Sequence, residues 1–132
     1  MIAPKITLLF TALHALLMIV LVYRVVAYRR GAKIGLGDGG DTRLLRRMRV
    51  HANFIEYVPM ALLLIALLEV CGLDARAVWA LGGTLLLGRL LHAQGLSSTG
   101  GVSIGRFWGT LLTWLVILAA ALLGVWLAWP LG

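Results

Sequence analysis

The residues best suited to chemistry lie in one segment, residues 46–59. Arg49, Asn53 and Glu56 are spaced i, i+4 and i+7, so a helix places them on one face, which Arg46 extends. Asn53 and Glu56 fall one to two turns inside an apolar run, where an unpaired carboxylate is costly. We therefore expect a polar cavity or a bundle interior around Glu56. An ion pair of Glu56 with Arg49 or Arg46 that only holds helices together is the alternative.

Three further polar groups are expected near the same face of the membrane as these residues. Arg89 and His92 are three residues apart near the end of a later apolar segment, and Arg106 opens the last one. Guanidinium groups bind carboxylates through paired hydrogen bonds, so this set suits a small, polar, multiply anionic molecule. Taken singly, Arg89 and Arg106 fit topology marking and lipid-phosphate contact better than ligand contact.

The elements that position these residues are expected to cross a membrane. With 61% hydrophobic and 13% charged residues, the 132-residue chain has too few charges for the polar shell of a soluble domain. Four apolar runs are expected to form helices over about 5–28, 42–70, 76–96 and 105–129, each near the length that spans a bilayer. The sequence therefore predicts a single domain over residues 1–132, an all-α integral membrane four-helix bundle.

The basic residues are distributed unevenly between the connections. Ten of the twelve Lys and Arg residues flank the first and third connections, and only Lys5 and Arg76 fall on the opposite side. By the positive-inside rule, both termini should lie outside the cytoplasm, and Trp126 and Trp129 fit an outer aromatic belt. Since this bias accounts for the net charge of +7, no nucleic-acid partner is expected.

Other candidate motifs are weak. Residues 35–40 match the pattern G-x-G-x-x-G, but they follow a membrane helix rather than a strand, so we interpret them as a flexible loop. Asp41 is expected to cap the second helix. Glu69 and Asp74 are expected to be solvated at the outer end, and His14 to be a packed or interfacial histidine. Because no metal-ligand spacing occurs, no metal is expected.

Two motifs resemble a known family. The pattern Arg49-x-x-x-Asn53-x-x-Glu56-Tyr57-x-Pro59 resembles the second-helix signature of the MAPEG family, the membrane-associated proteins in eicosanoid and glutathione metabolism. Arg89-x-x-His92 resembles the third-helix motif of its prostaglandin-forming branch. Residues 51–59 are most similar to uncharacterised bacterial members, which implies a bacterial inner membrane protein.

The resemblance implies a ligand and an assembly. The family's protomers form a homotrimer in the lipid bilayer, and glutathione binds between neighbouring subunits near the cytoplasmic face. The implied glutathione-binding residues are Arg46, Arg49, Asn53, Glu56, Tyr57, Arg89 and His92. The implied catalytic residue is Arg106, the nearest match to the arginine that stabilises the glutathione thiolate.

The function implied is that of a glutathione-binding membrane protein of the microsomal glutathione transferase or peroxidase type, acting on a lipophilic electrophile. Leu96 stands where the eicosanoid-forming branches carry a tyrosine, so ligand binding is better supported than any particular reaction. A small four-helix drug or ion transporter with Glu56 as its coupling carboxylate is the first alternative. The charge bias argues against it, because such transporters often insert in both orientations. A non-catalytic membrane scaffold without a ligand is the other alternative.

Overall fold

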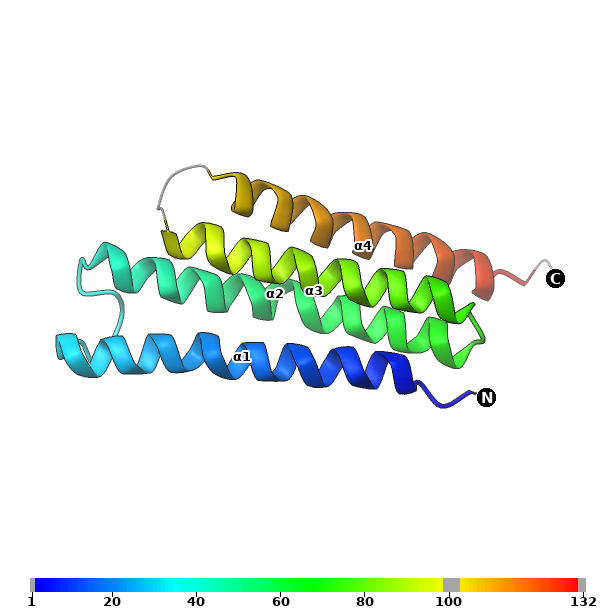
Figure 1. The fold of residues 1–132 in the computed structure, drawn as a ribbon, viewed down its shortest axis with the longest axis horizontal. Coiled ribbons are helices and arrows are strands. Elements are labelled where there is room, and N and C mark those ends of the chain that lie inside the picture. Colours follow the sequence, from blue (N-terminus) through cyan, green and yellow to red (C-terminus); the bar gives the residue numbers. More distant parts are fainter. Residues whose placement is uncertain (1, 99–102, 131–132) are drawn as a thin grey trace.

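Four helices make up the chain. The computed structural model describes residues 2–98 and 103–130, except the side chains of residues 96–98. The helices are α1 (Lys5–Ala32), α2 (Thr42–Val70), α3 (Ala75–Ser98) and α4 (Ile104–Ala128), and they run antiparallel in chain order (Figure 1). The predicted all-α fold is confirmed, and the bounds of three helices agree within two residues. Only α1 extends further than predicted, to Ala32.

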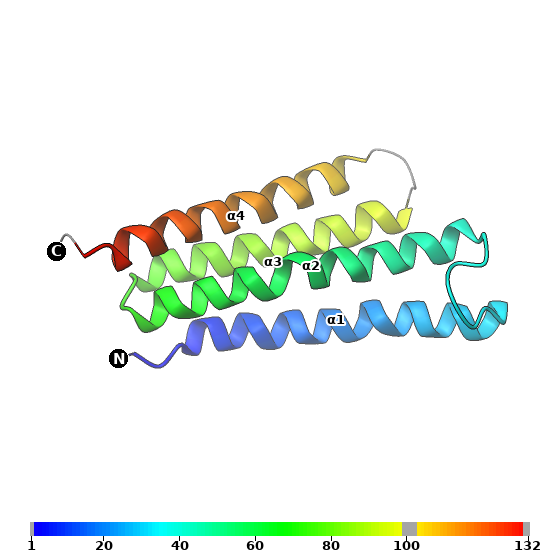
Figure 2. The ribbon, with the colours of Figure 1, turned by 180° about the vertical axis from the view of Figure 1, so that it is seen from behind.

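The helices are arranged around a central pair. α2 and α3 lie in the middle, with α1 on one side and α4 on the other, as Figures 1 and 2 both show. Within the described ranges, α1 and α4 do not contact each other, and α3 packs most extensively against α4. Two apolar clusters fill the interior; they are formed by Leu21, Val50, Phe54, Val58 and Ala93, and by Ala61, Ile65, Val78, Leu85 and Val116.

All four helices are long enough to cross a lipid bilayer. α1, α2 and α4 are long and apolar enough to span a membrane by length and composition. α3 carries two arginines, but its 24 residues extend about 36 Å. Because α2 ends and α4 begins at opposite ends of the bundle, α3 must cross back between them (Figure 1). Leu8, Leu63 and Leu118 are 67%, 55% and 57% exposed, as lipid-facing side chains should be.

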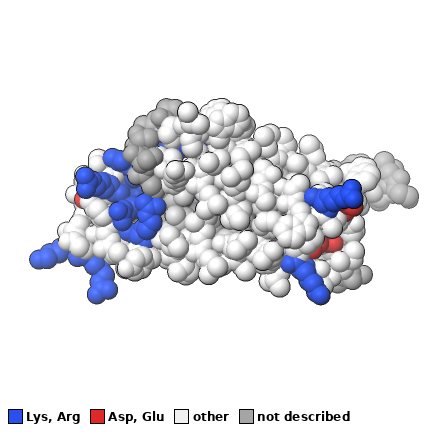
Figure 3. Space-filling model, viewed as in Figure 1, with Lys and Arg blue, Asp and Glu red and all other residues white. Residues whose placement is uncertain are grey.

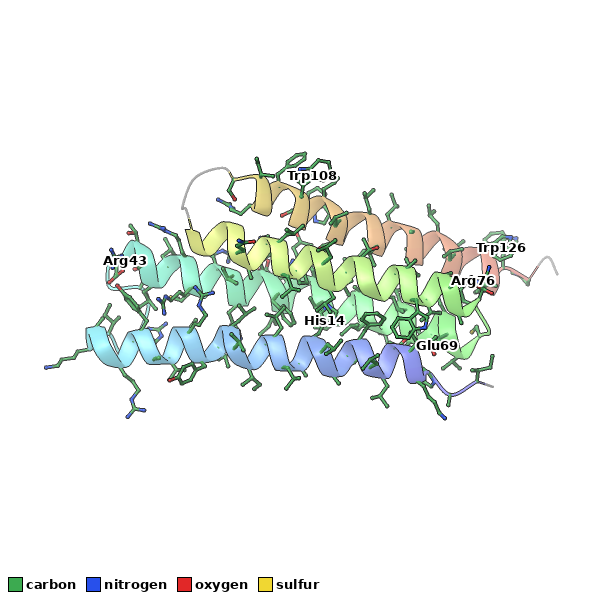
Figure 4. The ribbon with its side chains drawn as sticks, viewed as in Figure 1. His14, Arg43, Glu69, Arg76, Trp108 and Trp126 are labelled. Carbon is green, nitrogen blue, oxygen red and sulfur yellow. The ribbon has the colours of Figure 1, made fainter. Side chains whose placement is uncertain are left out.

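The two ends of the bundle differ in charge. Both termini lie at one end, which we call the terminal end (Figure 1). The α1–α2 connection, the end of α3 and the start of α4 lie at the other, where Lys and Arg gather; we call it the basic end (Figure 3). Trp126 is exposed at the terminal end (Figure 4). The termini therefore share a side, and their orientation relative to the cytoplasm stays a prediction.

The glycine-rich connection between α1 and α2 is a loop, as predicted. Gly37, Gly39 and Gly40 have positive φ angles, which a glycine adopts without steric cost. Oδ1 of Asp38 accepts a hydrogen bond from the Gly40 N–H at 2.9 Å. The predicted cap is confirmed, because Oδ1 of Asp41 accepts hydrogen bonds from the N–H groups of Arg43 and Leu44 at 2.9 and 3.1 Å.

The prediction that Glu69 is solvated is wrong. Its side chain is 5% exposed and reaches the start of α1 (Figure 4). The carboxylate accepts hydrogen bonds from the Ile6 N–H at 3.0 Å, the Thr7 N–H at 2.8 Å and the Thr7 hydroxyl at 2.6 Å. Because Pro4 provides α1 with no side-chain cap, Glu69 satisfies its otherwise unpaired donors and stabilises the positive end of the helix dipole. Asp74 is exposed, as predicted.

Candidate functional site

The polar face of α2 has the residues that the spacing predicted. Nη2 of Arg49 lies 3.8 Å from Oε1 of Glu56, so the ion pair named as the alternative is present, but it forms within α2 and does not join two helices. However, the side chains of Arg49 and Glu56 are 53% and 52% exposed. Glu56 therefore lies on the surface of the protomer, and the expectation of a bundle interior around it is wrong. A charged pair on a membrane-spanning helix is costly in lipid unless water, a ligand or another subunit covers it.

Two neighbours on this face have unsatisfied polar atoms. Oδ1 of Asn53 and Nε of Arg46 are buried, and neither atom has a hydrogen-bond partner in the described structure. Buried polar atoms in folded proteins are nearly always hydrogen-bonded. Arg46 lies one turn before Arg49, and Asn53 lies between Arg49 and Glu56 on α2. These two atoms therefore mark hydrogen-bonding capacity that the protomer itself does not use.

Arg89 and His92 lie behind this face rather than on it. Their side chains are 2% and 4% exposed, and the guanidinium carbon of Arg89 lies 5.8 Å from the centre of the Phe54 ring, within cation–π range. His92 is close enough to Arg49, Arg89 and Arg106 to interact electrostatically with all three. Basic residues of α2, α3 and α4 therefore converge around His92, as the topology predicted. Arg89 and His92 themselves are interior groups of the protomer.

Glycines hold α3 and α4 close together at this level. A Cβ atom added to Gly109 would lie 2.6 Å from both the Gly88 oxygen and the His92 nitrogen, and one added to Gly95 would lie 2.5 Å from the Arg106 nitrogen. The sequence analysis did not single out these residues. Their signal was present in Gly105-x-x-x-Gly109, the small-residue spacing that lets membrane helices approach closely. This contact, which we call the glycine seam, fixes the start of α4 relative to His92.

Arg106 opens onto a groove along the surface of α4. A pocket of about 360 Å³ is lined by Ser103, Arg106, Phe107, Thr110, Leu111 and Trp114. An adjoining pocket of about 500 Å³ is lined by Glu56, Tyr57, Met60, Trp114, Ile117, Leu118 and Ala121. Trp114 borders both pockets. The α2–α4 groove thus brings Arg106, Glu56 and Tyr57 to a single surface, with charged groups set among apolar side chains.

The remaining candidates lie away from the groove. His14 is 1% exposed and its Nδ1 lies 2.6 Å from the Phe10 oxygen, so the expectation of a packed histidine is confirmed. Across residues 2–98 and 103–130, no three His, Cys, Asp or Glu residues gather in a way that could hold a metal ion. The side chain of Leu96 lies outside the described residues.

Comparison with known proteins places most of the chain in one family. A model of the MAPEG family matches residues 7–126, from the first turn of α1 to near the end of α4. The chain is 33% identical over 124 residues to inner membrane protein YecN of Escherichia coli strain K12 and, equally, to YecN of Escherichia coli O6:H1 strain CFT073. Each match covers 93% of this chain and 93% of the relative.

Proposed function

Because the chain belongs to the MAPEG family, we propose that it is a bacterial inner membrane protein that binds glutathione at the α2–α4 groove. The observation that carries this proposal is the half-exposed Arg49–Glu56 pair within a membrane-spanning helix. Such a pair needs a polar partner in lipid, and a small zwitterionic, multiply anionic molecule provides one. The unpaired atoms of Arg46 and Asn53 lie on the same helix face and add donors and acceptors.

The residues present fit the chemistry of glutathione, which has two carboxylates, an ammonium group, two amides and a thiol. The guanidinium groups of Arg46 and Arg49 bind the carboxylates. Glu56 binds the ammonium group, and Asn53 bonds an amide in either direction. Tyr57 lines the groove beside Glu56. Arg89 and His92 lie beneath this face, where the positive charge of Arg89 favours an anionic ligand without touching it.

The exposure of the ion pair also supports assembly. A protomer alone leaves Arg49 and Glu56 facing the bilayer. Packing against the same face of further copies covers these side chains, and the family resemblance specifies a homotrimer. The binding site is then completed between neighbouring subunits, and one molecule of glutathione is held for each chain.

The proposed reaction is that of a glutathione transferase or peroxidase. Glutathione contributes a thiol nucleophile. Because a free thiol has a pKa of about 8.5, only about 3% of it is ionised at neutral pH. Arg106 lines the groove, and its positive charge favours the thiolate over the thiol. The apolar side chains of Trp114, Ile117 and Leu118 provide a surface for a lipophilic electrophile that enters from the bilayer.

Glu56→Gln is expected to weaken glutathione binding by about 1–3 kcal/mol, because it leaves the ammonium group and the neighbouring arginines without a counter-charge. Titration calorimetry on the purified protein in mild detergent measures the affinity, and native mass spectrometry counts chains and bound glutathione. Asp74→Asn makes the same change in charge at the exposed terminal end and is the matched control. A wild-type protein that binds no glutathione at millimolar concentration would contradict the proposal.

Arg106→Ala is expected to leave glutathione affinity largely intact and to raise the pKa of the bound thiol by about 1 or more. The reason is that Arg106 acts on the sulfur, whereas the α2 face holds the rest of the molecule. Ultraviolet absorbance of the thiolate against pH measures this pKa. Arg43→Ala removes an exposed cation from the same end and should leave the pKa unchanged. Equal pKa values in wild type and Arg106→Ala would exclude the catalytic role.

A further inference from the structure

A second charged pocket lies at the basic end of α1, away from the α2–α4 groove. It has a volume of about 380 Å³ and is lined by Val26, Arg29, Arg30, Lys33, Ile34 and Gly35. Three of these six residues are cations, and Val26 and Ile34 provide apolar walls. We propose that this pocket, which we call the α1 pocket, binds the phosphate headgroup of an anionic phospholipid, with the acyl chains running along the lipid-facing side of Val26.

The charge of the α1 pocket is available for a ligand. Arg30 and Lys33 are exposed, and neither has an acidic group within ion-pair distance among the residues that the structure describes. Both carboxylates of the neighbouring loop are engaged elsewhere. Asp38 accepts the hydrogen bond from the Gly40 N–H, and Asp41 caps α2 while accepting a 2.7 Å hydrogen bond from the Tyr28 hydroxyl. An external anion is therefore the natural counter-charge for Arg30 and Lys33.

The α1 pocket is also built by a defined turn. Nη1 of Arg29 donates to the Gly37 oxygen at 2.6 Å, and Nη2 lies 3.5 Å from Sδ of Met48 on α2, so this guanidinium is held in place. Lys33 adopts a left-handed conformation with φ 57°, and its N–H bonds to the Arg29 oxygen. The turn folds Ile34 back toward the end of α1, where the Ile34 N–H also bonds to the Arg29 oxygen at 3.0 Å. The Arg29 side chain and the backbone of the turn are thus held in place, and they bring Arg30, Lys33 and the apolar walls to one site.

The level of the pocket in the bilayer favours a lipid over a dissolved anion. Val26 is the last residue of the apolar run that begins at Ile6. At about 1.5 Å per residue, Arg29 and Lys33 lie about 4 and 10 Å beyond Val26 along the helix axis. The headgroup layer on each side of the hydrocarbon core is about 5–7 Å thick, so Arg29 lies at the level of the lipid phosphates. Lys33 begins just beyond this layer, and its long side chain can reach back to the phosphates. The adjoining apolar walls match the start of an acyl chain and offer nothing to free phosphate.

The test is a titration of the full-length protein in detergent with phosphatidylglycerol, followed by native mass spectrometry. The double variant Arg30→Gln/Lys33→Gln is expected to raise the dissociation constant about fivefold for each cation removed. Lys5→Gln/Arg76→Gln makes the same change in charge at the terminal end and should change it less than twofold. Both substituted pairs are exposed, so folding should be preserved, and glutathione affinity should match that of the wild type in both variants.

Three outcomes would overturn the assignment. An unchanged dissociation constant in Arg30→Gln/Lys33→Gln would show that the lipid binds elsewhere. An equal loss in Lys5→Gln/Arg76→Gln would show that only net charge matters. Displacement of phosphatidylglycerol by millimolar inorganic phosphate would show that the α1 pocket takes a dissolved anion. Weaker binding of phosphatidylcholine, which has the same phosphate but no net charge, supports the proposal.

Discussion

Replacing Glu69 by alanine should lower the free energy of unfolding by about 5 kcal/mol, the lower limit for three hydrogen bonds to a charged group that contribute about 1.5–3 kcal/mol each. The carboxylate accepts hydrogen bonds from two backbone N–H groups and one hydroxyl at the start of α1. Thr7 is 2% exposed, so its donors cannot turn to water when the acceptor is lost. The variant also removes the negative charge that stabilises this helix terminus.

Two control variants separate this effect from ordinary capping. Thr7→Val deletes the hydroxyl bond to the carboxylate and keeps the backbone bonds, so it should cost about 1.5–3 kcal/mol. Asp74→Ala deletes the carboxylate that accepts the Arg76 N–H at the exposed start of α3, and should cost about 1 kcal/mol. Reversible unfolding in mixed micelles measures all three variants. If Glu69→Ala costs no more than Asp74→Ala, Glu69 does not anchor α1.

The role of Glu69 shows why sequence could predict the helices but not this anchor. Apolar run length and the N-cap preference of Asp41 are local properties, and both predicted the observed elements. Glu69, by contrast, stands in the last turn of α2, next to a glycine turn, which is typical of a solvated terminal acid. Its partner Thr7 is 62 residues away in the chain. Only the antiparallel packing of α1 against α2 brings the two together.

The candidate site was also predictable only in part. Spacing within one helix could be read from the sequence, but the packing of that helix against its neighbours could not. Helical spacing correctly put Arg49 and Glu56 on one face. Spacing does not say whether that face meets the protomer's own interior or its surface, because both lipid and an apolar core penalise charge. Arg89 and His92 share a face of α3, but the other faces of α3 also mix polar and apolar residues, so no polarity contrast indicated that this face packs inward. The structure resolves both questions through the neighbours of each helix.

The glycine seam positions the site, although none of its glycines could be recognised as a functional residue from the sequence, since glycine has no side chain. Gly88 and Gly95 of α3 meet Gly105 and Gly109 of α4. A Cβ at Gly95, Gly105 or Gly109 would clash with backbone atoms of the opposite helix, and one at Gly88 would be tightly packed, 3.1 Å from the Leu112 Cβ and 3.2 Å from the Gly109 oxygen. The seam lies directly beside His92 and Arg106. It therefore sets the spacing between the interior histidine and the groove in which we place the thiol.

Gly109→Ala is expected to cost about 2–4 kcal/mol of stability, because a well-packed contact that gains a methyl group must shift its backbone. The new Cβ would lie 2.6 Å from the Gly88 oxygen and 2.7 Å from the His92 Cβ, and neither can rotate away. α4 must therefore move outward and carry Arg106 with it. We also expect a higher pKa of the bound glutathione thiol, because the distance between the guanidinium and the sulfur increases.

Gly124→Ala on the same helix is the matched control. A Cβ at Gly124 would have nothing within 4 Å, so no backbone shift is required. Alanine is the better helix former, and this variant should be neutral or more stable by up to about 1 kcal/mol. Unfolding in mixed micelles and thiolate absorbance measure both variants in one preparation. Similar behaviour of Gly109→Ala and Gly124→Ala would contradict the glycine seam. Lower stability of Gly109→Ala with an unchanged thiol pKa would leave the seam in place, but would show that Arg106 does not depend on it.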